Sequence, residues 1–178
     1  MRKYLFISIL LIGCSQAETQ NTTKTYFDLE GLVNQQIKTL NKTQPLTLKN
    51  LLIGEKKETL NTTKIDWQKE LELFLQADLN KQSYQLSYNK TEMPSMLVYE
   101  LKKGENLPVK SLRIVFDADK TPQRIDALMQ VSNYQSEKTL SMDFDKSQLK
   151  SYHIEGWQEL FVGSKKGFEV NGILTYKK

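Results

Sequence analysis

The stretch VKSLRIVFDADKTPQRIDALMQV, residues 109–131, decides the fold of this chain. Apolar and polar residues alternate through it on both sides of an aspartate-rich polar segment. Leu112 and Ile114 flank Arg113, for example, and residues 124–131 continue the alternation. A period of two with turn residues between the two runs is typical of antiparallel strands that bury one face. The stretch therefore predicts a β-hairpin with one apolar face.

The same period continues on both sides of this hairpin. Short segments rich in Gly, Asn, Asp and Ser separate the runs and supply the turns. Seven strands are predicted in this part of the chain, at 84–88, 96–102, 109–116, 124–131, 139–145, 152–162 and 168–176. An earlier alternating run at 46–53 leads into a charged stretch and predicts a further strand at an edge of the sheet.

Two segments that precede these seven strands have helical periodicity instead. The apolar residues of each recur at spacings of three and four, which places them on one helix face. The second helix begins at Asp66, a good N-cap. The two apolar faces comprise Tyr26, Leu29, Val33, Ile37 and Leu40, and then Trp67, Leu71, Phe74, Leu75 and Leu79. The fold class is therefore α+β, with two N-terminal amphipathic helices packed on a curved, mainly antiparallel β-sheet of about seven or eight strands.

The chain opens with a signal for export. Met1-Arg2-Lys3 is cationic, and the apolar run 4–12 that follows is too short to span a bilayer. The run ends in Leu11-Ile12-Gly13-Cys14, which resembles the lipobox of bacterial lipoproteins. The resemblance implies cleavage before Cys14 and acyl chains such as palmitate on that residue. Two or three such chains anchor a protein stably.

Three regions are expected from this reading. Residues 1–13 form the signal peptide, 14–25 a lipidated flexible tether of polar residues, and 26–178 a single globular domain. In Gram-negative lipoproteins an Asp after the Cys favours the inner membrane, whereas this chain has Ser15. We therefore expect a membrane partner through Cys14, at the outer membrane, with the domain facing the periplasm.

Two blocks of the presumed domain carry a second resemblance. Residues 26–31 and 65–71, together with Phe74 and Asp78, are similar to segments of small uncharacterised lipoproteins of Bacteroidota-type bacteria. This resemblance covers the helices best and implies no activity.

Composition excludes several kinds of chemistry. The only cysteine is Cys14, so neither a disulfide, nor a thiolate metal site, nor a cysteine nucleophile is expected. The net charge of +4 loses Arg2 and Lys3 with the signal, and 4 − 2 leaves +2 on the mature chain. Because its cations are interleaved with acids, nucleic acid is not an expected partner.

The weak candidates for a ligand-binding site are His153, Glu155 and Trp157. Alternation puts the only histidine, His153, on the same strand face as Glu155. In a catalytic site, His153 could act as the general base and Glu155 could orient its imidazole ring. Trp157 follows Gly156, which we expect to form a β-bulge, and could mark a binding surface or the edge of the core.

Other acidic pairs have ordinary explanations. Asp117 and Asp119 could contribute to a calcium loop, but the segment lacks the remaining oxygen ligands, and a capped hairpin turn is favoured. Asp143 and Asp145 could form a carboxylate pair for hydrolysis, although a solvated strand face is favoured. The sequence contains no serine elbow, phosphate loop, dinucleotide fingerprint or zinc motif. We therefore expect no cofactor, no metal and no enzyme.

Several functions stay open at this point. The leading hypothesis is a non-enzymatic binding or accessory domain that contacts another envelope protein or a small apolar ligand. A carrier of lipids or lipoproteins with a half-barrel sheet is the alternative. A hydrolase would need His153, Glu155, Asp143 and Asp145 to converge. A secreted glycoprotein would use the Asn-x-Thr triplets, which begin at Asn21, Asn41, Asn61 and Asn89 in segments expected to be tether, helix ends or turns.

Overall fold

The computed structural model describes residues 24–131, 136–159 and 165–177. Cys14, Asn21 and the predicted signal and lipobox lie outside these residues. The elements, in chain order, are α1 (Leu29–Thr43), β1 (Leu46–Ile53), β2 (Lys56–Thr62), α2 (Trp67–Glu70), α3 (Glu72–Gln76), the 3-10 helix η1 (Gln82–Tyr84), β3 (Tyr88–Met93), β4 (Met96–Leu101), β5 (Val109–Phe116), β6 (Pro122–Val131), β7 (Ser136–Asp145), β8 (Gln148–Gln158) and β9 (Lys166–Thr175).

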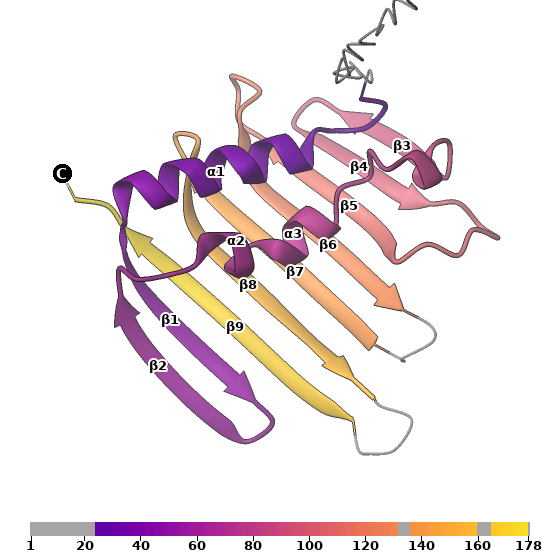
Figure 1. Cartoon of the computed structure of the whole chain (residues 1–178). Coiled ribbons are helices and arrows are strands. Elements are labelled where there is room, and N and C mark those ends of the chain that lie inside the picture. Colours follow the sequence, from indigo (N-terminus) through magenta and orange to yellow (C-terminus); the bar gives the residue numbers. More distant parts are fainter. Residues whose placement is uncertain (1–23, 132–135, 160–164, 178) are drawn as a thin grey trace, which may run out of the picture.

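One antiparallel sheet contains all nine strands, in the order β2-β1-β9-β8-β7-β6-β5-β4-β3 (Figure 1). From β3 to β9 each strand pairs with the next along the chain, as in a meander. The exception is β1, which pairs with β9 from Leu46–Thr175 to Ile53–Phe168. The N-terminal hairpin β1-β2 is thereby joined to the C-terminal strand.

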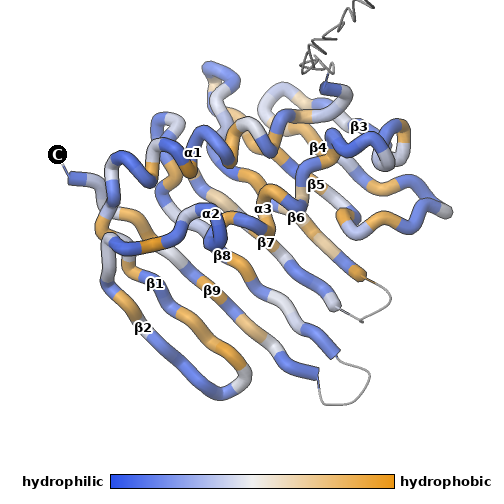
Figure 2. Tube along the Cα trace, viewed as in Figure 1, coloured by the Kyte–Doolittle hydropathy of each residue, from blue (hydrophilic) through white to orange (hydrophobic). Residues whose placement is uncertain are grey.

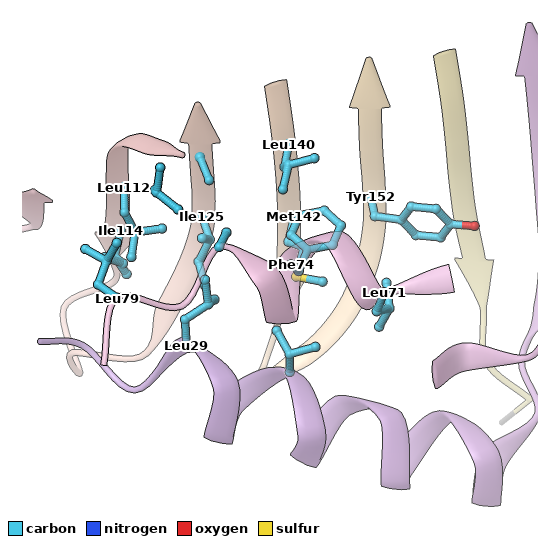
Figure 3. Packing of buried hydrophobic residues seen from close by; sticks show 14 of the residues in the cluster. Leu29, Leu71, Phe74, Leu79, Leu112, Ile114, Ile125, Leu140, Met142 and Tyr152 are labelled. Atoms are coloured by element: carbon cyan, nitrogen blue, oxygen red, sulfur yellow. The ribbon is translucent and has the colours of Figure 1, made fainter. Parts of the chain in front are cut away.

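The three α-helices lie across one face of the sheet (Figure 1). We call this the helix-covered face; its buried side chains include Leu112, Ile114, Ile125, Leu140, Met142 and Tyr152. Leu29, Leu71 and Phe74 of the helical segments point into the same layer (Figure 3). The buried apolar side chains form one cluster, whose removal from water stabilises the fold. None of the helices in the described ranges is long and apolar enough to span a membrane.

Tyr152 joins the short helices to the sheet. Its ring makes an edge contact with Trp67, at 6.4 Å between centroids. The ring also covers Gly172 of β9, where a Cβ atom would come within 2.0 Å of it. The hydroxyl donates a hydrogen bond of 2.6 Å to Glu70 Oε1, and Glu70 Oε2 also pairs with Lys49. One tyrosine thus links α2 to two neighbouring strands.

Polar contacts fix α1 over the sheet. Its N-cap Asp28 accepts a hydrogen bond from Gly31 N, and the buried carboxylate of Asp78 accepts one from Glu30 N. In the middle of α1, the Gln36 amide donates a hydrogen bond to Ser147 O and accepts one from Leu149 N. Gln36 is buried because it lies on the apolar stripe of α1, three residues after Val33 and four before Leu40.

The α+β class and the antiparallel sheet are confirmed, and β5 has the predicted limits. The predicted count of about seven or eight strands is too low, because β2 was missed; β3 replaces the strand predicted at 84–88, with which it shares only Tyr88. β2 forms the edge of the sheet, so the prediction that the strand at 46–53 is an edge is wrong. The residues of β2 are almost all exposed, and Figure 2 shows its mainly hydrophilic character. An edge strand of this kind has no buried face and hence no apolar alternation.

The prediction of two N-terminal helices is also wrong in detail. The β1-β2 hairpin lies between α1 and α2, and the helix expected from Asp66 divides at Leu71 into α2 and α3. Leu71 has φ −101° and ψ 10°, outside the helical region. Residues 84–88 are not one strand, because Tyr84 ends η1 and Tyr88 begins β3.

Candidate functional site: the open face of the sheet

The face of the sheet opposite the helices carries the polar side chains of the central strands. We call it the open face. The strand register aligns one polar row across it, in the order Asn50, Asn171, His153, Ser141, Asp126 and Arg113. Neighbouring side chains in such a row lie about 5 Å apart, within reach of direct contact.

One part of the open face is an ion-pair network in which the charges are matched. Arg113 Nη2 lies 2.6 Å from Asp126 Oδ2, and Arg124 pairs with both Asp126 at 2.9 Å and Asp143 at 2.8 Å. Ser151 donates a further hydrogen bond to Asp143. The side-chain hydrogen bond to Asp126 raises the pKa of Arg124 above its ordinary value. Both aspartates are therefore neutralised by guanidinium groups.

A pocket of about 350 Å³ lies elsewhere on the open face, over β7, β8 and β9. We call it the Trp157 pocket; its lining includes Leu52, Glu137, Thr139, Glu155, Trp157 and Glu169. The register explains this set, because Glu155 pairs with Thr139 on one side and with Glu169 on the other, while Trp157 pairs with Glu137. Three strands therefore place three carboxylates beside one indole ring.

Two glycines shape this pocket. Gly167 pairs with Trp157 on β9, so no side chain covers the indole from that neighbouring position. Gly156 pairs regularly with Lys138, which shows that the predicted β-bulge at Gly156 is wrong. A Cβ atom at Gly156 would lie 2.4 Å from the main-chain oxygen of Glu137, so close backbone approach accounts for this glycine.

His153 borders the Trp157 pocket and belongs to a hydrogen-bonded group. Its Nδ1 contacts Asn171 Oδ1, and its Nε2 lies 3.4 Å from Glu155 Oε2. Asn171 Nδ2 donates to Glu169 Oε1 at 2.6 Å, which leaves Asn171 Oδ1 as the acceptor for a proton on His153 Nδ1. His153 Nδ1 also lies 3.9 Å from Glu169 Oε1, so the imidazole stands between two carboxylates.

The three predicted candidates, His153, Glu155 and Trp157, do lie on one face of β8. The four residues required for the hydrolase do not converge. Asp143 pairs with Ser151, two residues before His153, and is bound by Arg124. Asp145 pairs with Gln148 at the end of the β7-β8 hairpin.

The other acidic candidate, Asp117, caps a turn as predicted. Its Oδ1 accepts hydrogen bonds from the main-chain N–H groups of Asp119 and Thr121. Across the residues that the structure describes, His, Cys, Asp and Glu side chains form no group able to hold a metal ion.

Glu137 and Glu169 were missed as site residues. Alternation places each on a strand face, but only the order of strands in the sheet brings them beside Glu155. The sequence does place Glu169 on the polar face of its strand, because it lies two residues before the polar Asn171. This alternation could have marked Glu169 as a residue of the open face. The turn residues between the two strands predict that β9 follows β8, but no local pattern fixes the register that places Glu169 opposite Glu155.

Among the described residues, His153 is the one side chain able to carry a positive charge within 4 Å of a carboxylate of the Trp157 pocket, at 3.4 Å from Glu155 and 3.9 Å from Glu169. Within 24–131, 136–159 and 165–177, Lys and Arg side chains form no ion pair with Glu137, Glu155 or Glu169. Glu137 Oε2 instead accepts a hydrogen bond from the Gln130 amide. The ammonium of Lys165 lies over the indole, with its Nζ 3.7 Å from the centre of the Trp157 ring.

The asparagines of the described triplets are exposed. Asn41 lies in the last turn of α1, and Asn61 and Asn89 lie in the edge strands β2 and β3. The expectation that all of them lie in the tether, helix ends or turns is therefore wrong for Asn61 and Asn89.

No protein-family model matches this chain, and neither a curated protein nor a solved structure matches it. These comparisons therefore connect the chain to no enzyme family. The resemblance of its helical segments to small lipoproteins stays a prediction.

Proposed function

We propose that this chain is a lipid-anchored envelope protein whose domain binds a ligand or partner and does not transform it. The observation that carries the proposal is the open face, on which an aromatic ring, three carboxylates and exposed apolar side chains surround a pocket. A concave site of this composition is a common form of binding site.

Exposed apolar side chains add contact area beside the pocket. Leu48 and Ile173 face each other across β1 and β9 and are 40 % and 51 % exposed. Leu52, which also lines the pocket, is 37 % exposed. Exposed apolar residues grouped on one face favour an interaction surface over a purely solvated one.

A carrier of acyl chains is less well supported. Such a carrier would need space between the helices and the sheet, but this layer is occupied by Trp67 and Phe74, which are only 2 % and 1 % exposed. Leu75 packs against the same cluster.

The anchor rests on the lipobox-like segment at Cys14. With acyl chains at Cys14, the stretch from there to Tyr26 would be the tether between the membrane and the domain. Outer-membrane localisation, with the domain in the periplasm, follows from Ser15 as an expectation for Gram-negative lipoproteins.

The intact mass of the protein extracted from membranes in mild detergent tests the anchor. The expected mass is residues 14–178 plus a diacylglyceryl group, with or without a further acyl chain. A Cys14→Ser variant should lose this mass and its membrane association. A processed chain without lipid, or one that carries glycans, would overturn the anchor.

Noncovalent mass retained by the native protein tests the binding role. Retention should disappear in Trp157→Ala and persist in Met93→Ala, which changes an exposed apolar residue on the distant edge strand β3. Equal retention by both variants would show that binding does not use the Trp157 pocket.

A further inference from the structure

We propose that the Trp157 pocket binds an alkylammonium group, that is, a primary amine on an aliphatic stem such as a lysine side chain or a diamine. This inference rests on the proposed binding function and names the chemical class of its ligand.

The first argument is the contrast in charge between two parts of the open face. Asp126 and Asp143 are matched by Arg113 and Arg124 at 2.6–2.9 Å. In the described residues, Lys and Arg side chains form no ion pair with the carboxylates of the Trp157 pocket, which come from adjacent strands; His153 alone approaches them, at 3.4 Å from Glu155 and 3.9 Å from Glu169. Like charges on neighbouring strands repel one another, and a bound cation would relieve this repulsion.

The second argument is the aromatic wall. A cation over the face of an indole ring is attracted by the ring quadrupole, and Trp is the best of the aromatic side chains in this respect. The ammonium of Lys165 already lies over the Trp157 ring, at 3.7 Å from its centre. The ring is therefore accessible to a primary ammonium group. The missing side chain at Gly167 keeps the neighbouring position free.

The third argument concerns the stem of the ligand. Leu52 and the edge of the indole give the pocket an apolar wall next to its carboxylates. A volume of about 350 Å³ accommodates a short aliphatic chain with its terminal amine. A bare metal ion would leave this apolar wall unused.

Lys165 acts in this arrangement as an internal competitor. An incoming ammonium must share or displace its position over Trp157. Removal of the Lys165 charge should therefore strengthen binding, whereas loss of a charge at a purely structural position would leave binding unchanged. General attraction to an acidic surface would change in the same direction, so the saturable shift of the Trp157 indole signal identifies the site, and the Lys165 variant tests only whether the ring face is shared.

The experiment uses the two indole N–H signals of the lipid-anchored chain in detergent micelles. The chain has two tryptophans, and the buried Trp67 serves as an internal control for Trp157. Pentane-1,5-diamine is titrated against its neutral isostere pentane-1,5-diol. The diamine should shift the Trp157 signal in a saturable and salt-sensitive way, while the diol should not.

Three variants in the pocket and one control variant on β3 complete the test. Glu155→Gln and Glu169→Gln should each weaken diamine binding by about two- to fivefold or more, and Lys165→Met should strengthen it by about two- to fivefold, the size expected for an exposed cation–π contact. Glu92→Gln, an exposed acid paired with Lys90 on β3, should change nothing. Equal binding of diamine and diol, an effect of Glu92→Gln as large as those in the pocket, or weaker binding by Lys165→Met would overturn the proposal.

A second titration separates the sources of the ammonium group. The peptide acetyl-Gly-Lys-Gly-amide is titrated in the same way as the diamine. Tighter binding of the peptide would assign the site to a lysine of a protein partner. Tighter binding of the diamine would assign it to a small amine. Either order supports the alkylammonium class. A native protein that retains a Trp157-dependent ligand but does not bind either probe would refute this class and leave the proposed binding function intact.

Discussion

Replacement of Tyr152 by phenylalanine tests how the short helices are held on the sheet. The variant removes one hydroxyl and keeps the ring that contacts Trp67 and covers Gly172. The lost hydrogen bond, 2.6 Å long, joins a residue that is 2 % exposed to the Glu70 carboxylate, whose side chain is 12 % exposed. Burial, together with the hydrogen bond to Glu70, raises the pKa of Tyr152 far above its ordinary value, so the hydroxyl stays a neutral donor.

A hydrogen bond to a charged group contributes about 1.5–3 kcal/mol, and we expect Tyr152→Phe to lower the free energy of unfolding by this amount. The measurement is urea denaturation followed by circular dichroism. Tyr176→Phe is the matched control, because its hydroxyl donates to the neutral main-chain oxygen of Leu149 at 2.7 Å. The control should lose about 0.5–1.5 kcal/mol. A loss for Tyr152→Phe no greater than that of the control would refute the charged-acceptor argument.

Three further predictions concern other parts of the fold. Gly156→Ala should destabilise the protein strongly, since the new Cβ would approach a main-chain oxygen at 2.4 Å, whereas Gly167→Ala, with its nearest neighbour at 3.8 Å, should have a small effect in the same denaturation assay. Partial burial pushes the pKa of Asp28 upward, but hydrogen bonds from Lys24 and from Gly31 N lower it below its ordinary value; Asp28 therefore stabilises the fold above that value and loses this contribution as pH falls through the folded pKa. Asp28→Asn should show a flatter loss of stability below about pH 4, and an unchanged pH profile would contradict this. Phe74→Ala should cost about 3–5 kcal/mol, because the ring is fully buried under the helices, and a loss below about 1 kcal/mol would show that α3 does not anchor the layer.

Local patterns were sufficient for the parts of the fold that depend on neighbouring residues. The alternation around Leu112 and Ile114 identifies β5 and its buried face, and the spacing from Leu29 to Leu40 identifies α1. The division of the second helix at Leu71 could not be predicted in this way. Its apolar stripe is helical throughout, and packing onto the sheet overrides local propensity there.

The candidate site, too, could be predicted only in the part that depends on neighbouring residues of one strand. Alternation puts His153, Glu155 and Trp157 on one face of β8. Glu137 and Glu169 join them only because β7 and β9 flank β8 with a particular register. A change of register by one residue would move both carboxylates to the opposite face, and single-sequence patterns do not determine it.

The pairing of β1 with β9 has a consequence for the order in which the protein folds. The meander from β3 to β8 contains only pairs of consecutive strands, so its loops close over short distances. The β1-β2 hairpin has no place in the sheet until β9, which ends at Thr175, has been synthesised and has paired with β8. A chain that stopped before Lys166 would expose the edge of β8 and leave the hairpin unattached, with both available for pairing with other chains. Completion of the sheet therefore waits until β9 has been synthesised and can pair with both β8 and β1.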